Sequence, residues 1–288
     1  MIKKQKIKPL FIWAGGKTKM MKHYEDLFPS PFENTIKSYS EPFFGGGAML
    51  LNVTKRFPKL QKIHINDING GLVGIYRSVK DNVEEFCDGL DELQSQYIPL
   101  SKDKRKEFFF NLRHENAWNY EGWSNVKESY VLYFLMKTGF NGIWQINKNT
   151  NNRYGTPSGL LNQKDTMYDK WNVMLWHELL NKYDVNILNG DWKDCPMGDF
   201  TFYDPPYRDS FANYNTRFPD EETELLIKRV EENPKRFVWL CNRDSNDGYF
   251  DNRNANIKRF PITYTVGRRK KTKDGFKATK ATEILLYN

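Results

Sequence analysis

Cysteine and histidine are scarce in this chain of 288 residues. It contains four histidines and three cysteines, Cys87, Cys195 and Cys241, and none has the spacing of metal ligands. Few cysteines are typical of a reducing compartment, and the missing spacing argues against a zinc site. We therefore expect a cytoplasmic protein without a metal.

Long hydrophobic runs are missing as well. Hydrophobic residues make up 39% of the chain, and no apolar run approaches the length of a membrane span. The lysine-rich first residues are not followed by the apolar stretch of a signal peptide. These features predict a soluble protein that is neither exported nor membrane-bound, and we expect a monomer in solution.

Acidic residues are outnumbered. The chain has 44 Lys and Arg against 36 Asp and Glu, a net charge of +8. This balance favours a polyanionic partner. Aromatic residues reach 15% and are interleaved with Lys, Arg and Asn, a pattern that suits base stacking as well as core packing.

The start and the end of the chain carry the sequence patterns of β-strands. Near its start, three segments pair an apolar run with a glycine-rich turn and a helical continuation: PLFIWAGGK, SYSEPFFGGGAML and KIHINDINGGLVGIY. This rhythm predicts βα units and a parallel sheet. Strand patterns return at VNILN, TFYD and RFVWLC and in a final pair, ITYTV and EILLY.

The middle of the chain has a different composition. It is rich in Trp, Tyr, Phe, Asn and Lys, with helical periodicity around Glu107–Arg113 and Tyr130–Lys137. We predict an α/β sheet domain formed by residues 1–82 and 179–288 and interrupted by a mostly helical insertion, residues 83–178.

The final strand pair brackets a dense basic cluster. This arrangement predicts an antiparallel hairpin at a sheet edge with a cationic loop. Lysines in such a loop could serve only to prevent aggregation. The density of charge favours phosphate contacts instead. The cluster consists of Arg268, Arg269, Lys270, Lys271 and Lys273.

The tetrapeptide Asp204-Pro205-Pro206-Tyr207 is the most specific motif of the chain. Its chance occurrence is roughly two in a thousand random chains of this length. The preceding residues, 200–203, predict a buried strand that two prolines must end. A carboxylate and an aromatic ring then stand where α/β sheets bind ligands, although a plain strand end with a turn has the same local pattern.

Glycine turns follow the first two apolar segments. EPFFGGGA, from Glu41 to Ala48, allows close approach of the backbone to a ligand at a helix start. It lacks the spacing of the phosphate-binding loop and of the dinucleotide fingerprint. WAGGK, from Trp13 to Lys17, adds an aromatic ring and a cation. Asp67, at a second strand end, suits either a ribose ligand or a helix cap.

In chain order, these motifs resemble the DNA adenine-N6 methyltransferase family of the Dam type. The resemblance rests on WAGGK, EPFFGGGA, NDIN, GFNGIWQIN, RYGTPSG, NGDW and DPPY, and it spans nearly the whole chain. It implies a Rossmann-like sheet that binds S-adenosylmethionine, with S-adenosylhomocysteine as the product, and an inserted helical domain that recognises double-stranded DNA. It also implies a bacterial cell, or one infected by a phage, as the setting.

The resemblance also implies site residues. Those expected at the cofactor are Trp13, Ala14, Gly15, Lys17, Glu41, Phe43, Gly45, Gly46, Asp67, Asp191 and Asp204. Those expected at the reacting amine are Asp204, Pro205, Pro206 and Tyr207. Those expected at the DNA, besides the basic cluster, are Asn141, Ile143, Gln145, Asn147, Arg153 and Pro157. The string FNGIW alone would also fit a packed helix end with a turn.

Two positions depart from the pattern of family members that recognise GATC. Ile12 stands where that pattern has lysine before the tryptophan, and Gln145 stands in place of an arginine. Lysine and arginine pair well with guanine, whereas isoleucine cannot form a hydrogen bond and glutamine suits adenine. We therefore expect relaxed or altered flanking specificity. Two alternatives remain: a catalytically silent DNA-binding protein, and an RNA or protein N-methyltransferase.

Overall fold

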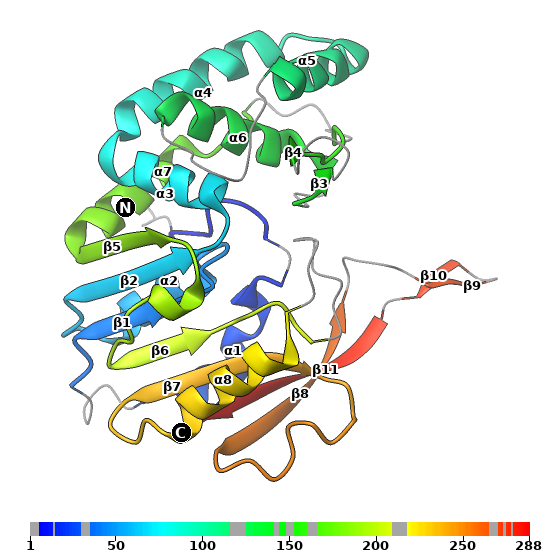
Figure 1. Cartoon of the computed structure of the whole chain (residues 1–288). Coiled ribbons are helices and arrows are strands. Elements are labelled where there is room, and N and C mark those ends of the chain that lie inside the picture. The colour runs from blue at the N-terminus through cyan, green and yellow to red at the C-terminus, as the bar shows by residue number, and fades with distance from the viewer. Residues whose placement is uncertain are drawn as a thin grey trace.

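A seven-stranded sheet runs through the middle of the molecule (Figure 1). The structure, a computed structural model, describes residues 6–13, 15–29, 35–115, 125–140, 144–147, 153–159, 166–208, 218–264, 270–272, 275–277 and 279–288. The strands of the sheet are β1 (Ser38–Glu41), β2 (Lys62–Asp67), β5 (Asp184–Asn189), β6 (Phe200–Tyr203), β7 (Phe237–Asp244), β8 (Asn256–Tyr264) and β11 (Thr279–Tyr287).

The strand order is β5-β2-β1-β6-β7-β11-β8. The five strands from β5 to β7 pair in parallel, and β11 runs antiparallel between β7 and β8. The sequence-based strand predictions for VNILN, TFYD, RFVWLC and the final antiparallel pair are confirmed. This order is that of a Rossmann-like methyltransferase sheet, as the sequence predicted.

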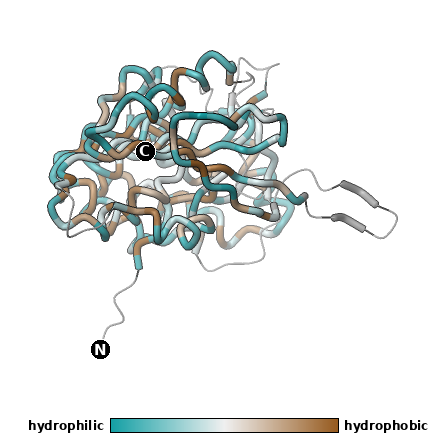
Figure 2. Tube along the Cα trace, turned by 90° about the horizontal axis from the view of Figure 1, so that it is seen from below, coloured by the Kyte–Doolittle hydropathy of each residue, from teal (hydrophilic) through white to brown (hydrophobic). Residues whose placement is uncertain are grey.

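The inner strands of the sheet are apolar because side chains pack on both of its faces. Figure 2 shows the corresponding brown, hydrophobic stretches in the middle of the molecule. All four residues of β6 are buried. On one face, α8 (Asp220–Glu231) buries Leu226, Ile227 and Val230, the spacing of one helical stripe, against β7 and β11. The remaining short helices near the sheet are η1 (Lys17–Lys19), α1 (Met21–Tyr24), η2 (Glu25–Leu27), α2 (Ala48–Arg56) and η5 (Trp192–Asp194).

A helical layer lies beyond the β5 edge of the sheet (Figure 1). In it, α6 packs against α3, α4 and α5 and is buried on nearly all sides, which explains its apolar sequence. The elements of the layer are α3 (Gly70–Asp81), α4 (Val83–Tyr97), α5 (Lys102–Glu115), α6 (Val126–Thr138), α7 (Lys170–Lys182) and a small hairpin of β3 (Ile146–Asn147) and β4 (Arg153–Tyr154). The helices predicted around Glu107–Arg113 and Tyr130–Lys137 are confirmed, while the expected boundary at 178 falls inside α7.

A second small hairpin projects beyond the ends of β8 and β11 (Figure 1). It pairs β9 (Lys270–Thr272) with β10 (Gly275–Lys277). The last pair joining β8 and β11 is Tyr264 and Thr279. The predicted hairpin at the sheet edge is therefore present, with part of the basic cluster in β9.

The first predicted βα unit lacks its strand, and that prediction was wrong. Residues 9–13 form no strand because helix side chains satisfy the backbone there. The Asn172 side chain accepts from the Lys8 amide at 2.9 Å and donates to its carbonyl at 3.0 Å, while the Tyr133 hydroxyl donates to the Leu10 carbonyl at 3.0 Å. The apolar run therefore serves as a link between the sheet and the helical layer.

Candidate active site

The carboxyl ends of three parallel strands meet at one edge of the sheet. Glu41 ends β1, Asp67 ends β2 and Asp204 directly follows β6. The chain leaves β1 toward β2 and β5 on one side and returns to β6 on the other. This reversal of strand order is a topological switch point, which is where α/β sheets bind ligands.

The loop after β6 contacts the N-terminal glycine turn through one buried lysine. The Lys17 ammonium lies 2.7 Å from both carboxylate oxygens of Asp204 and donates to the Tyr207 hydroxyl at 2.8 Å and the Gly15 carbonyl at 2.9 Å. The structure therefore brings together residues of WAGGK and DPPY that are 187 positions apart in the sequence.

Burial dominates the electrostatics of this cluster. The Lys17 side chain is only 3% exposed and that of Asp204 is 20% exposed. Burial raises the pKa of Asp204 to about 6, and the Lys17 ammonium opposes that rise. Burial alone would lower the pKa of Lys17, but Asp204 and Tyr207 hold it above its ordinary value. Lys17 thus stays charged at neutral pH, and Asp204 is ionised above about pH 6.

The turn after β1 needs glycine. Gly45 and Gly47 have φ of +50° and +70°, in the left-handed region. A Cβ on Gly45 would lie 2.7 Å from ring atoms of Trp13, so the backbone passes directly beneath that ring. The Gly45 amide donates to Asp67 at 2.9 Å. The turn is therefore held between Trp13 and Asp67, two residues that the sequence analysis expects at the cofactor.

Asp67 does not cap the helix that follows it, which corrects the capping interpretation. Asn69 caps α3, because its side chain accepts from the amides of Gly71 and Leu72. Asp67 accepts from the amides of Gly45 and Asn69, both at 2.9 Å, and burial raises its pKa to about 6. A buried carboxylate with no capping role suits a ligand hydroxyl.

An aromatic cluster joins the loop after β1 to η5 and β6. Phe43 stacks on Trp192 with ring centroids 6.1 Å apart, and it meets Tyr203 edge to face at 6.5 Å. Asp191 caps η5 through the Lys193 amide and its side chain is 52% exposed. Among the predicted acidic residues, Asp191 is therefore the most open to solvent.

The two positions that depart from the GATC pattern flank a pair of tryptophans. Trp13 and Trp144 have ring centroids 6.0 Å apart, which places Ile12 and Gln145 in one region of the molecule. Ile12 is 69% exposed and Gln145 is also exposed. Asn147 of β3 and Pro157, three residues after β4, are exposed as well. These side chains are thus accessible to a partner.

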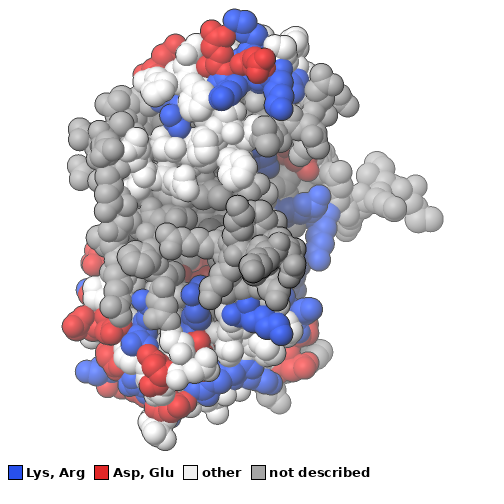
Figure 3. Space-filling model, turned by 90° about the vertical axis from the view of Figure 1, so that its right-hand side faces the viewer, with Lys and Arg blue, Asp and Glu red and all other residues white. Residues whose placement is uncertain are grey.

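Other predicted residues fall outside the described part of the chain. Ala14, Asn141, Ile143, Arg268, Arg269 and Lys273 lie outside it, as do the side chains of Arg153, Lys270 and Lys271. On the face that looks toward the carboxyl edge of the sheet, Lys and Arg side chains lie on both the helical and the sheet part, with Asp and Glu among them (Figure 3).

The sequence did not single out the end of β7, which also borders the DPPY loop. The Asn242 side chain accepts from the amide of Arg208, the residue after Tyr207, at 3.4 Å. The Arg243 guanidinium lies 5.8 Å from the centroid of the Tyr207 ring. The parallel pairing of β6 and β7 is the signal that could have located these residues.

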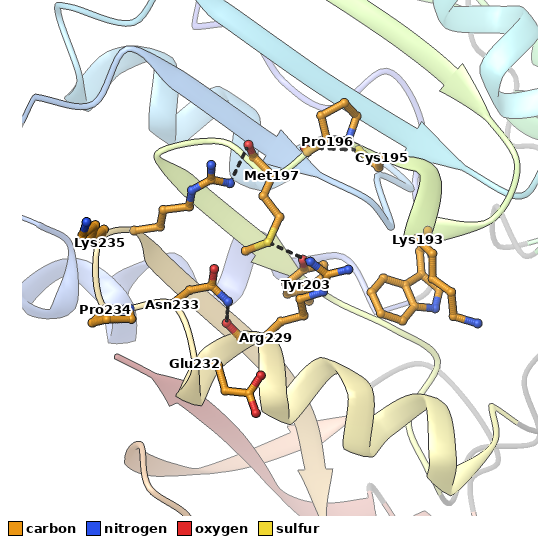
Figure 4. A pocket seen from close by; sticks show the side chains of 12 residues that line it. Lys193, Cys195, Pro196, Met197, Tyr203, Arg229, Glu232, Asn233, Pro234 and Lys235 are labelled. Carbon is orange, nitrogen blue, oxygen red and sulfur yellow. Dashed lines mark hydrogen bonds between the residues drawn. The ribbon is translucent and has the colours of Figure 1, made fainter.

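A cavity of about 550 Å³ lies elsewhere, under α8 (Figure 4). Its walls include segments that precede β6 and β7, such as Met197 and Arg236, together with Arg229 of α8. Arg229 points toward Met197 and donates to its sulfur at 3.5 Å (Figure 4). Arg236 donates to the Met197 carbonyl at 3.1 Å. Of the predicted site residues, none lines this cavity.

Metal-binding clusters and membrane-spanning helices are both absent from the described residues. No group of three or more His, Cys, Asp or Glu side chains is arranged to hold a metal ion. No helix in the described ranges has the length and apolar character needed to cross a membrane.

Several known methyltransferases are similar to this chain. The chain is 32% identical over 245 residues to the type II methyltransferase M.MjaIII of Methanocaldococcus jannaschii, covering 81% of this chain and 83% of that protein. It is 26% identical over 303 residues to the type II methyltransferase M1.LlaDCHI of Lactococcus lactis subsp. cremoris, covering 100% and 98%. It is 26% identical over 156 residues to the DNA adenine methylase of Haemophilus influenzae, covering 54% and 48%.

These similarities cover most of the chain. They therefore include the segments that form the parallel strands, the three acidic strand ends and the DPPY loop. The model of one family matches residues 13–260, which include the glycine turns, the helical layer and the DPPY loop. The chain belongs to the family of D12 class N6 adenine-specific DNA methyltransferases.

Proposed function

We propose that this enzyme transfers a methyl group from S-adenosylmethionine to the exocyclic amine of an adenine turned out of duplex DNA. The observation that carries the proposal is the buried cluster of Lys17, Asp204 and Tyr207 at the switch point of the sheet. A carboxylate, a carbonyl and an aromatic ring on one stiff loop suit an amine attached to a planar base.

The residues at the carboxyl ends of β1 and β2 fit S-adenosylmethionine. Asp67 offers a buried carboxylate for ribose hydroxyls, and Gly45 lets the backbone pass directly beneath the Trp13 ring. Phe43 supplies an apolar surface beside β1. The bound cofactor would supply a methyl group already activated by its sulfonium, so transfer needs mainly positioning and complementary charge.

The chemistry of the amine assigns the roles of the DPPY loop. The lone pair of adenine N6 is delocalised into the ring, which makes it a poor nucleophile. Hydrogen bonds from N6 to Asp204 and to the Pro205 carbonyl favour a tetrahedral nitrogen as the new N–C bond forms. The nitrogen then loses a proton, for which ionised Asp204 is the nearest acceptor. Tyr207 stacks on the extruded base.

Lys17 holds Asp204 in this arrangement. Its ammonium contacts both carboxylate oxygens, which fixes the plane of the carboxylate and favours its ionised form. A carboxylate accepts about four hydrogen bonds, so the pair with Lys17 leaves room for the amine. Lys17 therefore acts as a positioning residue.

The target sequence is GATC-like with relaxed or altered flanking preference. Ile12 and Gln145 are exposed beside the paired rings of Trp13 and Trp144, on a surface that DNA could reach. Without lysine and arginine at these two positions, discrimination of a flanking guanine falls by about 1 to 3 kcal/mol for each lost contact. The central A·T step remains as the anchor.

A methylome map in a host without DNA methylation tests the proposal. Sequencing should detect N6-methyladenine in cells that express the wild-type chain, at sites that share a central A·T step and vary at the flanks. Asp204→Ala should abolish the signal, because alanine has no oxygen to accept from the amine. Purified Asp204→Ala should still bind DNA and cofactor.

A different result would refute each part of the proposal. Near-normal methylation by Asp204→Ala would refute the role of this carboxylate. Methylation confined to GATC would refute relaxed specificity. Failure of tritium transfer from labelled cofactor to DNA, with DNA binding intact, would instead favour a catalytically silent DNA-binding protein.

A further inference from the structure

Arg208, the residue that follows the DPPY tetrapeptide, is anchored at several points. Its guanidinium donates to Asp220 at 3.0 Å and to Asp247 at 2.9 Å. Its Cζ lies 3.5 Å from the centroid of the Tyr249 ring. The side chain is only 10% exposed, so these contacts are not those of a solvated surface arginine.

The anchoring groups come from two other parts of the fold. Asp220 is the first residue of α8, and Asp247 and Tyr249 lie in the loop between β7 and β8. The Tyr249 hydroxyl donates to the Asp220 carbonyl at 3.2 Å, so the two parts are also joined to each other. Arg208 thus binds a surface that is already assembled.

The backbone of Arg208 is fixed as well. Its amide donates to the side chain of Asn242 in β7 at 3.4 Å. Tyr207 therefore stands between two restraints, the Pro205-Pro206 pair before it and the anchored arginine after it. The Tyr207 side chain is 9% exposed and contacts Lys17, so a shift of its backbone would also disturb that contact.

We propose that Arg208 is a positioning residue, which locks the exit of the DPPY loop to α8 and the β7–β8 loop and so sets the place of Tyr207. This inference rests on the proposed function, because the benefit of a fixed Tyr207 is a correctly stacked base. Displacement of a reacting group by about 1 Å costs about 100-fold in rate, so the lock contributes to turnover rather than to binding.

Lysine cannot replace this arginine. A planar guanidinium pairs with two carboxylates and stacks on a ring at the same time, whereas an ammonium is a compact point charge. Arg208→Lys should therefore recover only part of the turnover lost in Arg208→Met. Asp247→Asn, which removes one anchor and leaves Arg208 in place, should lower turnover less than Arg208→Met does.

Arg56 provides a matched control. It too pairs with a carboxylate, Glu25, and lies over an aromatic ring, Phe28, with Cζ 4.4 Å from the centroid. It ends α2, and its partners Glu25 and Phe28 are not among the predicted site residues. Arg56→Met removes a paired, ring-stacked arginine and should leave kcat unchanged.

Single-turnover methylation with saturating cofactor tests the inference. We expect Arg208→Met to lower the methyl-transfer rate by about 10- to 100-fold, with the cofactor KM and the DNA Kd within about twofold of the wild type. A duplex with 2-aminopurine at the target base should show weaker quenching by Tyr207 in the variant.

The outcomes separate the inference from the function on which it rests. Equal transfer rates for Arg208→Met and Arg56→Met would overturn the positioning role while wild-type activity upholds the function. A wild-type protein that transfers no methyl group to DNA would overturn both. If Arg208→Met does not fold, an unchanged rate in Asp247→Asn and Arg208→Lys would overturn the inference.

Discussion

Among single residues, Asp67 and Asp204 have similarly raised pKa values but different proposed roles. Burial raises both pKa values to about 6, although Asp67 is stabilised by two backbone amides and Asp204 by an ammonium. Asp67 faces the proposed cofactor and Asp204 the proposed base. The pH dependence of turnover and that of cofactor affinity therefore report on separate residues.

Turnover at saturating cofactor should fall by about tenfold per pH unit below about pH 6. The reason is that Asp204 must be ionised to accept from the amine, and the protonated form accumulates as the pH falls through its folded pKa. The measurement is kcat between about pH 5 and pH 8. A kcat that stays constant down to about pH 5 would contradict this role.

The cofactor KM should rise over the same range as Asp67 takes up its proton. Because the folded pKa of each carboxyl lies above its unfolded value, the stability that each contributes is present at low pH and is lost as the pH rises through about 6. Loss of activity at low pH should therefore occur without unfolding, which thermal melting in the same buffers checks.

Among the elements, the hairpin of β9 and β10 has two possible roles. It carries lysines beyond the last β8–β11 pair, where they could contact phosphates or only keep the sheet edge soluble. The two roles predict different effects of removing charge, because phosphate contacts release counterions and edge protection does not.

We expect Lys270→Ser with Lys271→Ser to weaken DNA binding. Each lost phosphate contact should reduce the slope of log K against log salt concentration by about 1. Pairing within the sheet ends at Tyr264 and Thr279, so the melting temperature should not change. Fluorescence anisotropy at several salt concentrations measures the slope. Unchanged affinity together with aggregation would instead support edge protection.

The elements also show what local pattern can predict. The apolar strands β6 and β7 were predictable because nearly all of their residues are buried inside the sheet, which leaves a continuous apolar run. Residues 9–13 have a similar run, but their backbone bonds to side chains such as Asn172, far away in the sequence. A local pattern cannot reveal a distant partner of the backbone.

The same limit applies to the candidate site. The motifs alone located Lys17, Asp67 and Asp204, because each has a characteristic neighbourhood in the sequence. Arg208 and Asn242 carry no motif, and their importance comes from contacts with α8 and the loop after β7. Only the folded arrangement reveals them.

For the whole molecule, cofactor binding should add to stability. A ligand that binds only the folded state at about 100 times its Kd contributes about 2.7 kcal/mol. For a protein of this size that corresponds to a rise in melting temperature of about 5 to 10 °C. Thermal melting with and without S-adenosylmethionine measures the shift.

Asp67→Asn is the matched variant for this measurement. Its amide oxygen can still accept from one of the two backbone amides, but its amide nitrogen cannot accept from the other, so the melting temperature without cofactor should fall and serves as the variant's own reference. The shift on adding cofactor should be smaller than that of the wild type. A full shift in the variant would show that Asp67 does not contact the cofactor.

The separation of Lys17 from Asp204 along the chain has a practical consequence. A cut between α5 and α6 would leave Lys17 and Asp67 on one fragment and Asp204 and Tyr207 on the other. Neither fragment would hold a complete site, while contacts of α3 with α6 and α7 offer a surface for reassociation. Methyl marks on DNA would then record permanently that two fragments, and any proteins fused to them, had met.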